Sequence, residues 1–250
     1  MKIVSILFIA IFLLSSQIVQ AQKIITEGSL IYNISIQTGS DEPKMADMLD
    51  GATTTINIKG SQSRSELISG LGSEVTIYDS KKGSGVILKD YSGQKLMITL
   101  TKGDWDKKNG KYEGITFETT NETMNIAGYK CNKAIAKLKD GSSFVVFYTP
   151  ELEMADKDYD SQFKTLPGLA LQYEWQSGKM RFKYTLSKIN FDAVASSRFD
   201  IPKSGYRVLT YGGNKKVIFF KVVNKKSRLC RDFLLKFISG QLFLDLIISL

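Results

Sequence analysis

Histidine is absent from all 250 residues of the chain. A Ser-His-Asp triad, a Cys-His nucleophile pair and a His-ligated metal site are therefore excluded, because each needs an imidazole. Only two cysteines are present, Cys131 and Cys230, too few for a four-cysteine zinc site or a disulfide framework. Glycine-rich motifs of the P-loop or dinucleotide type are also missing. We therefore expect no cofactor and no histidine-based catalysis.

A surplus of basic charge is present, but it is confined to one end of the chain. The whole sequence carries a formal net charge of +9, with 34 basic and 25 acidic side chains. The segment Gly212–Leu250 alone holds eight basic and two acidic residues. The span 22–211 is left with 25 basic and 23 acidic groups. A nearly neutral domain lacks the electrostatic footprint of a nucleic-acid-binding protein, so we expect no nucleic acid partner.

The first 21 residues have the pattern of a secretory signal peptide. Lys2 provides the positive start, Ile3–Leu14 is an apolar run, and Val19–Ala21 ends in the small residues that precede a cut. An N-terminal membrane anchor is the alternative, but the apolar run is shorter than the roughly 20 residues that span a bilayer. No cysteine lies near the cut. We expect a periplasmic or extracellular protein of a Gram-negative bacterium, not a lipoprotein.

Alternating apolar and polar residues dominate the span 22–211, the pattern of half-buried strands. The clearest runs are Leu30–Ile36, Leu96–Leu100, Leu169–Trp175 and Met180–Leu186. Weaker strand signals lie at Thr54–Lys59, Ser63–Ile68, Glu74–Asp79, Gly85–Tyr91, Gly114–Glu118 and Glu122–Ile126. Roughly a dozen short strands separated by turns predict a single all-β domain, an antiparallel barrel or sandwich.

Turns and helices complete the expected architecture. Lys139–Gly141 predicts a hairpin through an Asp-Gly turn, and Gln176–Gly178 joins the two clearest strands. Helical spacing of apolar residues is found only at Glu42–Leu49 and Met154–Phe163. The sequence thus predicts one or two short helices beside the strands.

Two groups of carboxylates are candidates for chemistry. Asp156, Asp158 and Asp160 have the spacing of a calcium loop, but the glycine and the glutamate that such a loop requires are missing. We therefore expect no metal site there and treat the three as weak candidates. Asp104 and Asp106 flank a tryptophan, so a hydrolase that uses these carboxylates, or those of the Asp156 group, stays open as a functional hypothesis. Nothing in the pattern raises the pKa of one carboxyl, so we expect a protein that is not an enzyme.

Cys131 is the only cysteine within the span 22–211. A single thiol in an exported protein is usually buried and inert. Pairing with Cys230 and a reactive thiol are the alternatives, and pairing requires a folded C-terminal segment. The sequence leaves all three readings open.

The run Phe144–Tyr148 is apolar on both faces, so the strand is either covered on both sides or has one side facing a ligand cavity. A curved sheet with few helices leaves its concave face for a lipid, an acyl chain or another apolar ligand. The large side chains on these strands are the candidate lining of such a cavity. They are Phe144, Val146, Tyr148, Tyr173, Trp175, Phe182 and Tyr184.

Three segments resemble an exported bacterial family of unknown function that is related to GLPGLI-type proteins. Ile126–Ala134 (IAGYKCNKA) is similar to its hairpin strand, Leu166–Glu174 (LPGLALQYE) to its LPGLPLEYE signature, and Phe199–Tyr206 to its closing FxIPxGY pattern. Ala170 stands where that signature often has proline. The resemblance implies a LolA-like fold, a strongly curved antiparallel sheet or unclosed barrel with short helices plugging its concave side. It brings no catalytic residues.

Gly212–Leu250 departs from the family pattern, which ends shortly after the Gly-Tyr motif. The segment is rich in Phe, Ile, Leu and Lys and has no strand alternation. A frameshifted or read-through end, a basic helix lying in a membrane interface, and a folded part of the core are the open readings. Membrane contact is expected only in the second case.

These observations together predict an exported envelope protein with one domain at 22–211. Its expected role is non-enzymatic binding of an apolar ligand, a lipid or acyl chain, in the concave face of the sheet. The alternative is a structural or protein-interaction module of the cell envelope that pairs its sheet edge with a partner protein.

Overall fold

The computed structural model of the chain describes residues 22–38, 51–91, 93–177 and 180–212. Three segments of the sequence analysis lie outside these residues. They are the expected signal peptide at 1–21, the expected helix at 42–49 and all but the first residue of the C-terminal segment 212–250. Cys230 lies in the last of them.

Within the described part of the chain, twelve strands form one sheet in the order β14-β7-β6-β5-β4-β3-β2-β13-β12-β10-β9-β8. Every neighbouring pair is antiparallel except β14 and β7, which run parallel. The strands are β2 (Glu27–Thr38), β3 (Thr53–Lys59), β4 (Gln62–Ser69), β5 (Gly72–Asp79), β6 (Ser84–Tyr91), β7 (Gln94–Thr101), β8 (Thr116–Ile126), β9 (Tyr129–Lys137), β10 (Ser143–Thr149), β12 (Leu169–Ser177), β13 (Met180–Asn190) and β14 (Arg207–Thr210). A separate parallel pair joins β1 (Lys23–Ile25) to β11 (Leu152–Met154).

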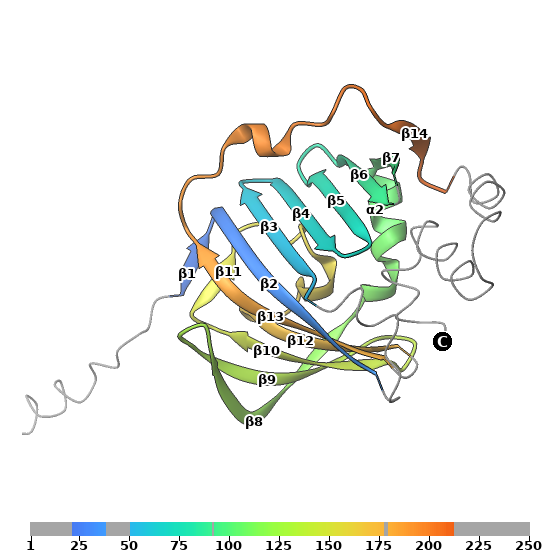
Figure 1. Cartoon of the computed structure of the whole chain (residues 1–250). Coiled ribbons are helices and arrows are strands. Elements are labelled where there is room, and N and C mark those ends of the chain that lie inside the picture. The colour runs from blue at the N-terminus through green and yellow to red at the C-terminus, as the bar shows by residue number, and fades with distance from the viewer. Residues whose placement is uncertain (1–21, 39–50, 92, 178–179, 213–250) are drawn as a thin grey trace, which may run out of the picture.

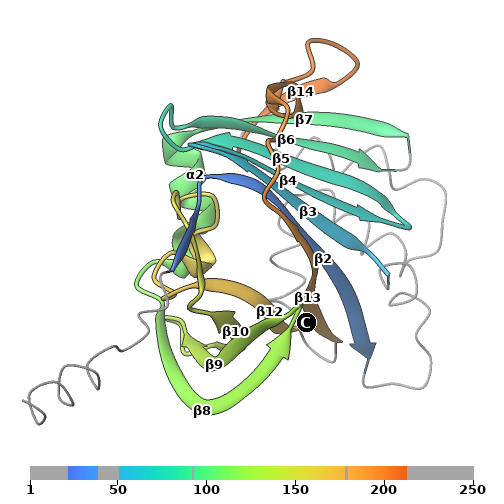
Figure 2. The ribbon, with the colours of Figure 1, turned by 90° about the vertical axis from the view of Figure 1, so that its left-hand side faces the viewer.

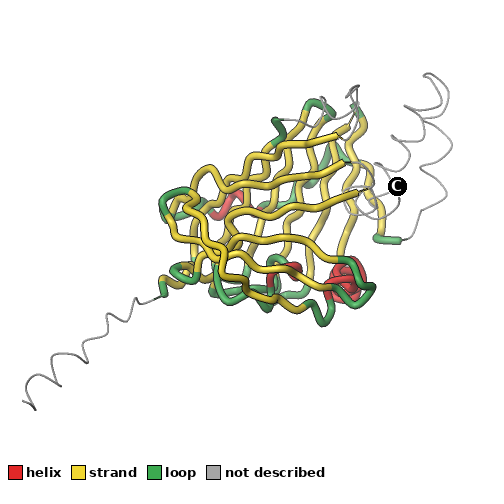
Figure 3. The backbone as a smooth tube through the Cα atoms, turned by 90° about the horizontal axis from the view of Figure 1, so that it is seen from below, coloured by secondary structure: helices red, strands yellow, loops and turns green. Residues whose placement is uncertain are grey.

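The large sheet bends into a C, and its two edge strands β14 and β8 do not meet (Figures 1 and 2). Figure 3 shows that strands make up most of the described chain and that the helical pieces are short. The expected all-β class, an unclosed and strongly curved antiparallel sheet, is therefore confirmed.

Local turn chemistry sets several of the strand pairings. The Lys139–Gly141 turn joins β9 to β10, and Asp140 accepts hydrogen bonds from the backbone and hydroxyl of Ser142 at 2.9 and 2.6 Å. Ala127 and Gly128 both have positive φ and form the two-residue turn between β8 and β9. The two short strands expected at 114–118 and 122–126 are one strand, β8, because a register shift between Thr119 and Thr123 absorbs the irregular residues.

The helix α2 (Lys102–Asn109) was not anticipated from the sequence. Thr101 and Asp104 form a capping box at its start, with the Asp104 carboxylate accepting from the Thr101 backbone at 3.0 Å. The expected helix at Met154–Phe163 was wrong, since this segment holds only the end of β11 and the 3-10 turn η2 (Ser161–Phe163). Asp156 and Asp160 accept hydrogen bonds from backbone N–H groups two residues on, which competes with helix formation.

The main core fills the concave side of β2, β3, β9, β10, β12 and β13. The loop before β12 is packed against it through Leu166, which is fully buried. Gly168 is required there, because a Cβ at this position would lie 2.2 Å from the Thr149 carbonyl oxygen. The opposite, convex face of β5–β7 is covered by Val194, Phe199 and Tyr206 of the segment that leads to β14. The sheet is therefore covered on its convex side near one edge and left open for a cavity on its concave side.

Candidate functional site

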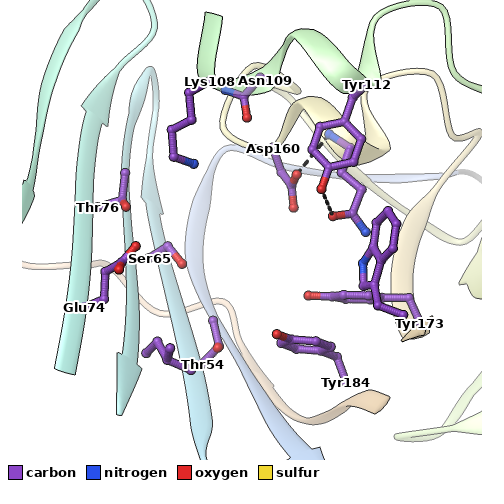
Figure 4. A pocket seen from close by; sticks show the side chains of 13 residues that line it. Thr54, Ser65, Glu74, Thr76, Lys108, Asn109, Tyr112, Asp160, Tyr173 and Tyr184 are labelled. Atoms are coloured by element: carbon purple, nitrogen blue, oxygen red, sulfur yellow. Dashed lines mark hydrogen bonds between the residues drawn. The ribbon is translucent and has the colours of Figure 1, made fainter. Parts of the chain in front are cut away.

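A cavity of about 190 Å³ lies on the concave side of the sheet. One wall comes from β3, β4 and β5, the facing wall from β12 and β13, and the remaining side from α2, the 3-10 turn η1 (Gly110–Tyr112) and η2 (Figure 4). The lining residues are Thr54, Ser65, Leu67, Glu74, Thr76, Lys108, Asn109, Tyr112, Asp160, Gln162, Tyr173, Trp175 and Tyr184. Segments that are far apart in the sequence thus converge on one small space.

The wall from β3, β4 and β5 is mostly polar. Ser65 lies opposite Thr76 in the sheet register, and Thr76 and Glu74 are two positions apart on β5, so their side chains face the same side. Glu74 is held by the ammonium group of Lys89, which is 3.0 Å away and almost completely buried. This ion pair compensates the Glu74 charge and fixes its carboxylate at the wall.

The facing wall is aromatic. Tyr173 and Tyr184 are direct cross-strand partners, and their rings stack with centroids 4.6 Å apart and planes at 8°. The Phe163 ring packs against the Tyr173 ring in a T-shaped contact, with the two ring centroids 4.9 Å apart. Trp175 follows on the same face of β12 and packs against Phe144 at 4.1 Å. Such interlocked rings form a rigid apolar surface.

The helix α2 carries two polar residues to the rim of the cavity. Its Trp105 is buried against Tyr78 of β5, which fixes the helix on the sheet. Lys108 and Asn109 at the end of the helix line the cavity, and Figure 4 shows the Lys108 side chain extending toward the wall formed by Glu74 and Thr76.

Asp160 and Gln162 come from the start of η2. The Asp160 carboxylate accepts a hydrogen bond from the Gln162 backbone N–H at 3.0 Å, which caps the turn. The Gln162 side chain is 7% exposed, and its Oε1 accepts from the Tyr112 hydroxyl at 3.2 Å. Its Nε2 is buried and has no hydrogen-bond partner within the described residues. A buried amide group without a partner is costly and is satisfied when a ligand or water binds.

Burial shifts the pKa values of the ionisable groups at the cavity. Burial raises the pKa of the Asp160 carboxyl to about 6, against the opposing effects of the Gln162 N–H and of Lys108. Burial lowers the pKa of Lys108, although Glu74 and Asp160 oppose this shift. The groups facing Asp160 are this one lysine and the phenols of Tyr32, Tyr112, Tyr159 and Tyr173, whose own pKa values burial raises. Perturbed ionisable groups in a cavity mark a candidate functional site.

The structure separates the candidate residues of the sequence analysis into two groups. Tyr173, Trp175 and Tyr184 line the cavity. The other four are packed in the main core, each at most 4% exposed, and do not reach the cavity. They are Phe144, Val146, Tyr148 and Phe182.

The other carboxylate candidates have structural partners. Asp156 accepts hydrogen bonds from the Ser80 hydroxyl and the Asp158 backbone, and Asp158 pairs with Lys164 at 2.5 Å. Among the described residues, no three acidic or cysteine side chains are grouped as metal ligands. Asp104 caps α2, and Asp106 pairs with Lys102 at 2.8 Å on the exposed side of that helix.

Cys131 is fully buried on β9, and its burial raises the pKa of the thiol to about 11. A thiol with so high a pKa is almost entirely protonated near pH 7, and the thiolate is the reactive form. The burial and the raised pKa of Cys131 fit a buried, inert thiol. The pairing alternative involves Cys230, which lies outside the described residues.

Sequence reasoning missed the polar half of the cavity, chiefly Glu74, Lys108 and Gln162. The alternation on β5 puts Val75 and Ile77 on one face and Glu74 and Thr76 on the other, and nothing in this pattern says which face is concave. That apolar face is instead covered on the convex side by the segment before β14. The segment's covering role has no local signal in the sequence.

No family model matches the chain, and no curated protein matches it. Among solved structures, PNGF-II is similar over 74% of this chain and 31% of its own, with 14% identity and a TM-score of 0.40. MucB is similar over 73% of this chain and 58% of its own, with 11% identity and a TM-score of 0.33. The Pseudomonas aeruginosa MucA/MucB complex gives 10% identity and a TM-score of 0.35, over 70% and 56% of the two chains.

The chain therefore spans less than two thirds of each of these structures. No helix in the described part of the chain combines the length and apolarity needed to cross a membrane.

Proposed function

We propose that the protein is a non-enzymatic binding protein of the cell envelope that holds a small ligand in the concave cavity. The observation that carries the proposal is the buried Nε2 of Gln162, which lacks a partner among the described residues and belongs to a side chain that lines the cavity. Asp160 and Lys108 line the same space with pKa values displaced by burial. An unsatisfied buried polar group beside ionisable groups in one cavity is typical of a ligand site.

The lining favours a different ligand from the lipid or acyl chain expected from the sequence. Eight of the thirteen lining residues are polar or charged. An alkyl chain in this space would remove water from Asp160, Lys108 and Gln162 without offering hydrogen bonds in return. The cavity of about 190 Å³ is also smaller than the roughly 300–1,000 Å³ of sites for drug-sized ligands. A small ligand with one apolar face and polar edges fits the aromatic wall and the polar rim together.

The proposal includes export and a relation to the GLPGLI-type proteins. Its supports are the signal-peptide pattern of residues 1–21 and the three motif segments, which fall on β8–β9, on β12 with its preceding loop, and on the segment before β14. The single domain at 22–211 and the three readings of 212–250 stay predictions.

The alternative, a protein-interaction module that pairs its sheet edge with a partner, has its natural place at β8. This edge strand is exposed along most of its length. The register shift between Thr119 and Thr123 interrupts its ladder, and Glu118 and Glu122 are tied to lysines of β9 at 2.6 and 2.8 Å. Irregular, charged edges oppose the addition of a further strand. We therefore place ligand binding first.

Extraction of the purified full chain tests the proposal. The protein is purified from the cells that make it and denatured, and the aqueous and chloroform–methanol fractions are analysed by mass spectrometry. The variant Ser65→Phe fills the cavity, and Ile68→Phe changes an exposed position of the same strand. Circular dichroism checks that both variants fold.

We expect a stoichiometric small molecule in the aqueous fraction of the wild-type protein and of Ile68→Phe, reduced at least tenfold in folded Ser65→Phe. A lipid in the organic fraction that depends on the cavity would restore the apolar-ligand prediction. Only a stoichiometric protein partner, with no small molecule in either fraction, would favour the interaction module and overturn the proposal.

A further inference from the structure

Lys108 and Asp160 carry opposite charges and line the same cavity. Each charge attracts the other, but no direct ion pair joins them within the described residues. Both side chains lie at the cavity in Figure 4, with Lys108 extending from the end of α2 and Asp160 from the segment before η2. The Asp160 carboxylate accepts one backbone hydrogen bond, from Gln162. The Lys108 ammonium lies 5.4 Å from the centroid of the Trp105 ring, a weak interaction.

Several other lysines and carboxylates of the described residues form direct ion pairs. Glu74 pairs with Lys89 at 3.0 Å, Asp106 with Lys102 at 2.8 Å and Asp158 with Lys164 at 2.5 Å. The charges at the cavity are held apart on separate supports instead. Lys108 is fixed by a helix that Trp105 anchors, and Asp160 is fixed by its capping bond.

Lys108 and Asp160 are both half-buried, so each charge keeps only part of its water, and neither gains the stabilisation of a direct ion pair with the other. Burial raises the pKa of Asp160 and lowers the pKa of Lys108. Both shifts favour the neutral form of the group. A ligand that brings a positive group to Asp160 and a negative group to Lys108 would compensate both charges at once.

We propose that the ligand is a small zwitterion of the amino-acid type, a deepening that rests on the proposed function. Its ammonium group contacts the Asp160 carboxylate. Its carboxylate accepts hydrogen bonds from the Lys108 ammonium and from the free Nε2–H of Gln162. Its apolar part lies on the aromatic wall of Trp175 and Tyr184.

Other ligand classes leave part of this site uncompensated. A simple amine leaves Lys108 without a partner, and a simple carboxylic acid leaves Asp160 without one. Glu74 does not replace Asp160 as the partner of a ligand's ammonium group, because Glu74 already forms an ion pair with Lys89. A neutral sugar forms hydrogen bonds but cancels neither charge. The volume of about 190 Å³ holds several water molecules at about 30 Å³ each, which suits a single amino acid and not a peptide.

Isothermal titration calorimetry on the full chain tests this inference. Bound material is first removed by unfolding and refolding, and recovery of the fold is checked by circular dichroism. The probes are the twenty protein amino acids, one at a time, with glucose and hexanoate as a neutral polyol and an apolar acid. For an amino acid that binds, the matching amine without the carboxylate and the matching acid without the ammonium group are titrated next.

We expect at least one amino acid to bind and both of its truncated analogues to bind at least tenfold more weakly. Asp160→Asn and Lys108→Met should each weaken binding at least tenfold. Asparagine keeps the capping oxygen of Asp160, so that variant should fold normally. Lys107→Met, at an exposed position on the same helix, should bind like the wild-type protein.

Binding of glucose or hexanoate without any amino acid would overturn the zwitterion and leave the proposed function standing. An analogue that binds as tightly as its parent amino acid would also overturn the zwitterion. If none of the probes binds, the inference fails, and the extraction experiment decides separately whether the cavity holds a ligand.

Discussion

The indole ring of Trp105 lies parallel to the phenol ring of Tyr78, with centroids 4.0 Å apart and ring planes at 9°. This contact joins α2 to β5 and is almost fully buried on both sides. Apart from Gly103, the remaining residues of α2 are polar or charged. The position of the helix, and with it the position of Lys108 at the cavity, therefore depends on one stacked pair.

Replacing Trp105 by alanine should destabilise the protein by about 3 kcal/mol, the usual size of a buried aromatic deletion. Urea unfolding followed by far-ultraviolet circular dichroism measures the change. Lys107→Ala alters an exposed residue of the same helix and should stay within about 0.5 kcal/mol of wild type. Equal effects of the two substitutions would show that the stack does not hold the helix.

Gly168 should be intolerant of even a methyl group. A Cβ at this position would approach the Thr149 carbonyl oxygen to 2.2 Å, and its φ of +148° is unfavourable for other residues. We expect Gly168→Ala to cost about 2 kcal/mol or more of unfolding free energy.

Gly128→Ala is the matched control, because this glycine also has positive φ but has open space around its missing Cβ. It should cost about 1 kcal/mol from backbone strain alone. If both variants lose the same stability in chemical denaturation, the close approach at Gly168 is not real.

Asp160 should make the protein more stable as the pH falls from about 6 toward 4. Burial raises the pKa of this carboxyl in the folded state to about 6, above its ordinary value of 3.8. Between these two values the folded state binds more protons than the unfolded state, so unfolding free energy decreases as the pH rises. Above the pKa of the folded state the buried carboxylate is charged, and its full desolvation cost lowers the unfolding free energy.

Melting temperatures of wild type and Asp160→Asn, measured from pH 4 to pH 8, isolate this contribution. The asparagine variant should be more stable than wild type at pH 7, and the difference should shrink toward pH 4. A difference that is constant across the range would contradict the assignment of the raised pKa to Asp160.

Cys131 should resist alkylation in the folded protein. Its side chain is fully buried and the pKa of its thiol is raised to about 11 by burial, so little thiolate forms at pH 8. Iodoacetamide labelling followed by peptide mapping should leave Cys131 unmodified until denaturant is added. Rapid labelling without denaturant would favour the reactive thiol, and a Cys131–Cys230 peptide would favour the pairing left open by the sequence.

Most of the strands could be predicted because their signals are local. The Asp-Gly turn at 139–141 and the alternation of Leu169–Trp175 each act within a few residues, and both match the structure. The helix α2 had no such signal, because its sequence KGDWDKKN is almost uniformly polar. Trp105 stabilises it through Tyr78 on another element, a contact that alternation and propensity do not report.

The aromatic wall of the cavity could be predicted for the same local reason, since Tyr173 and Tyr184 alternate with polar residues on adjacent strands. The polar wall could not. Which face of β5 is concave depends on the segment that covers Val75 and Ile77, and that segment comes from beyond β13. Asp160 and Gln162 were hidden by an expected helix, although Asp160 was noted for its spacing. The cavity was expected to be apolar because its candidate lining was taken only from the large apolar and aromatic side chains of the strands.

A crystal structure of the protein purified directly from the cells that make it is the most direct test of the central claim. The account predicts electron density for a small molecule between the Trp175–Tyr184 wall and Lys108, within hydrogen-bond distance of Gln162 Nε2 and Asp160. A cavity that is filled by the protein's own side chains would contradict the account. A cavity that holds only water would contradict it as well.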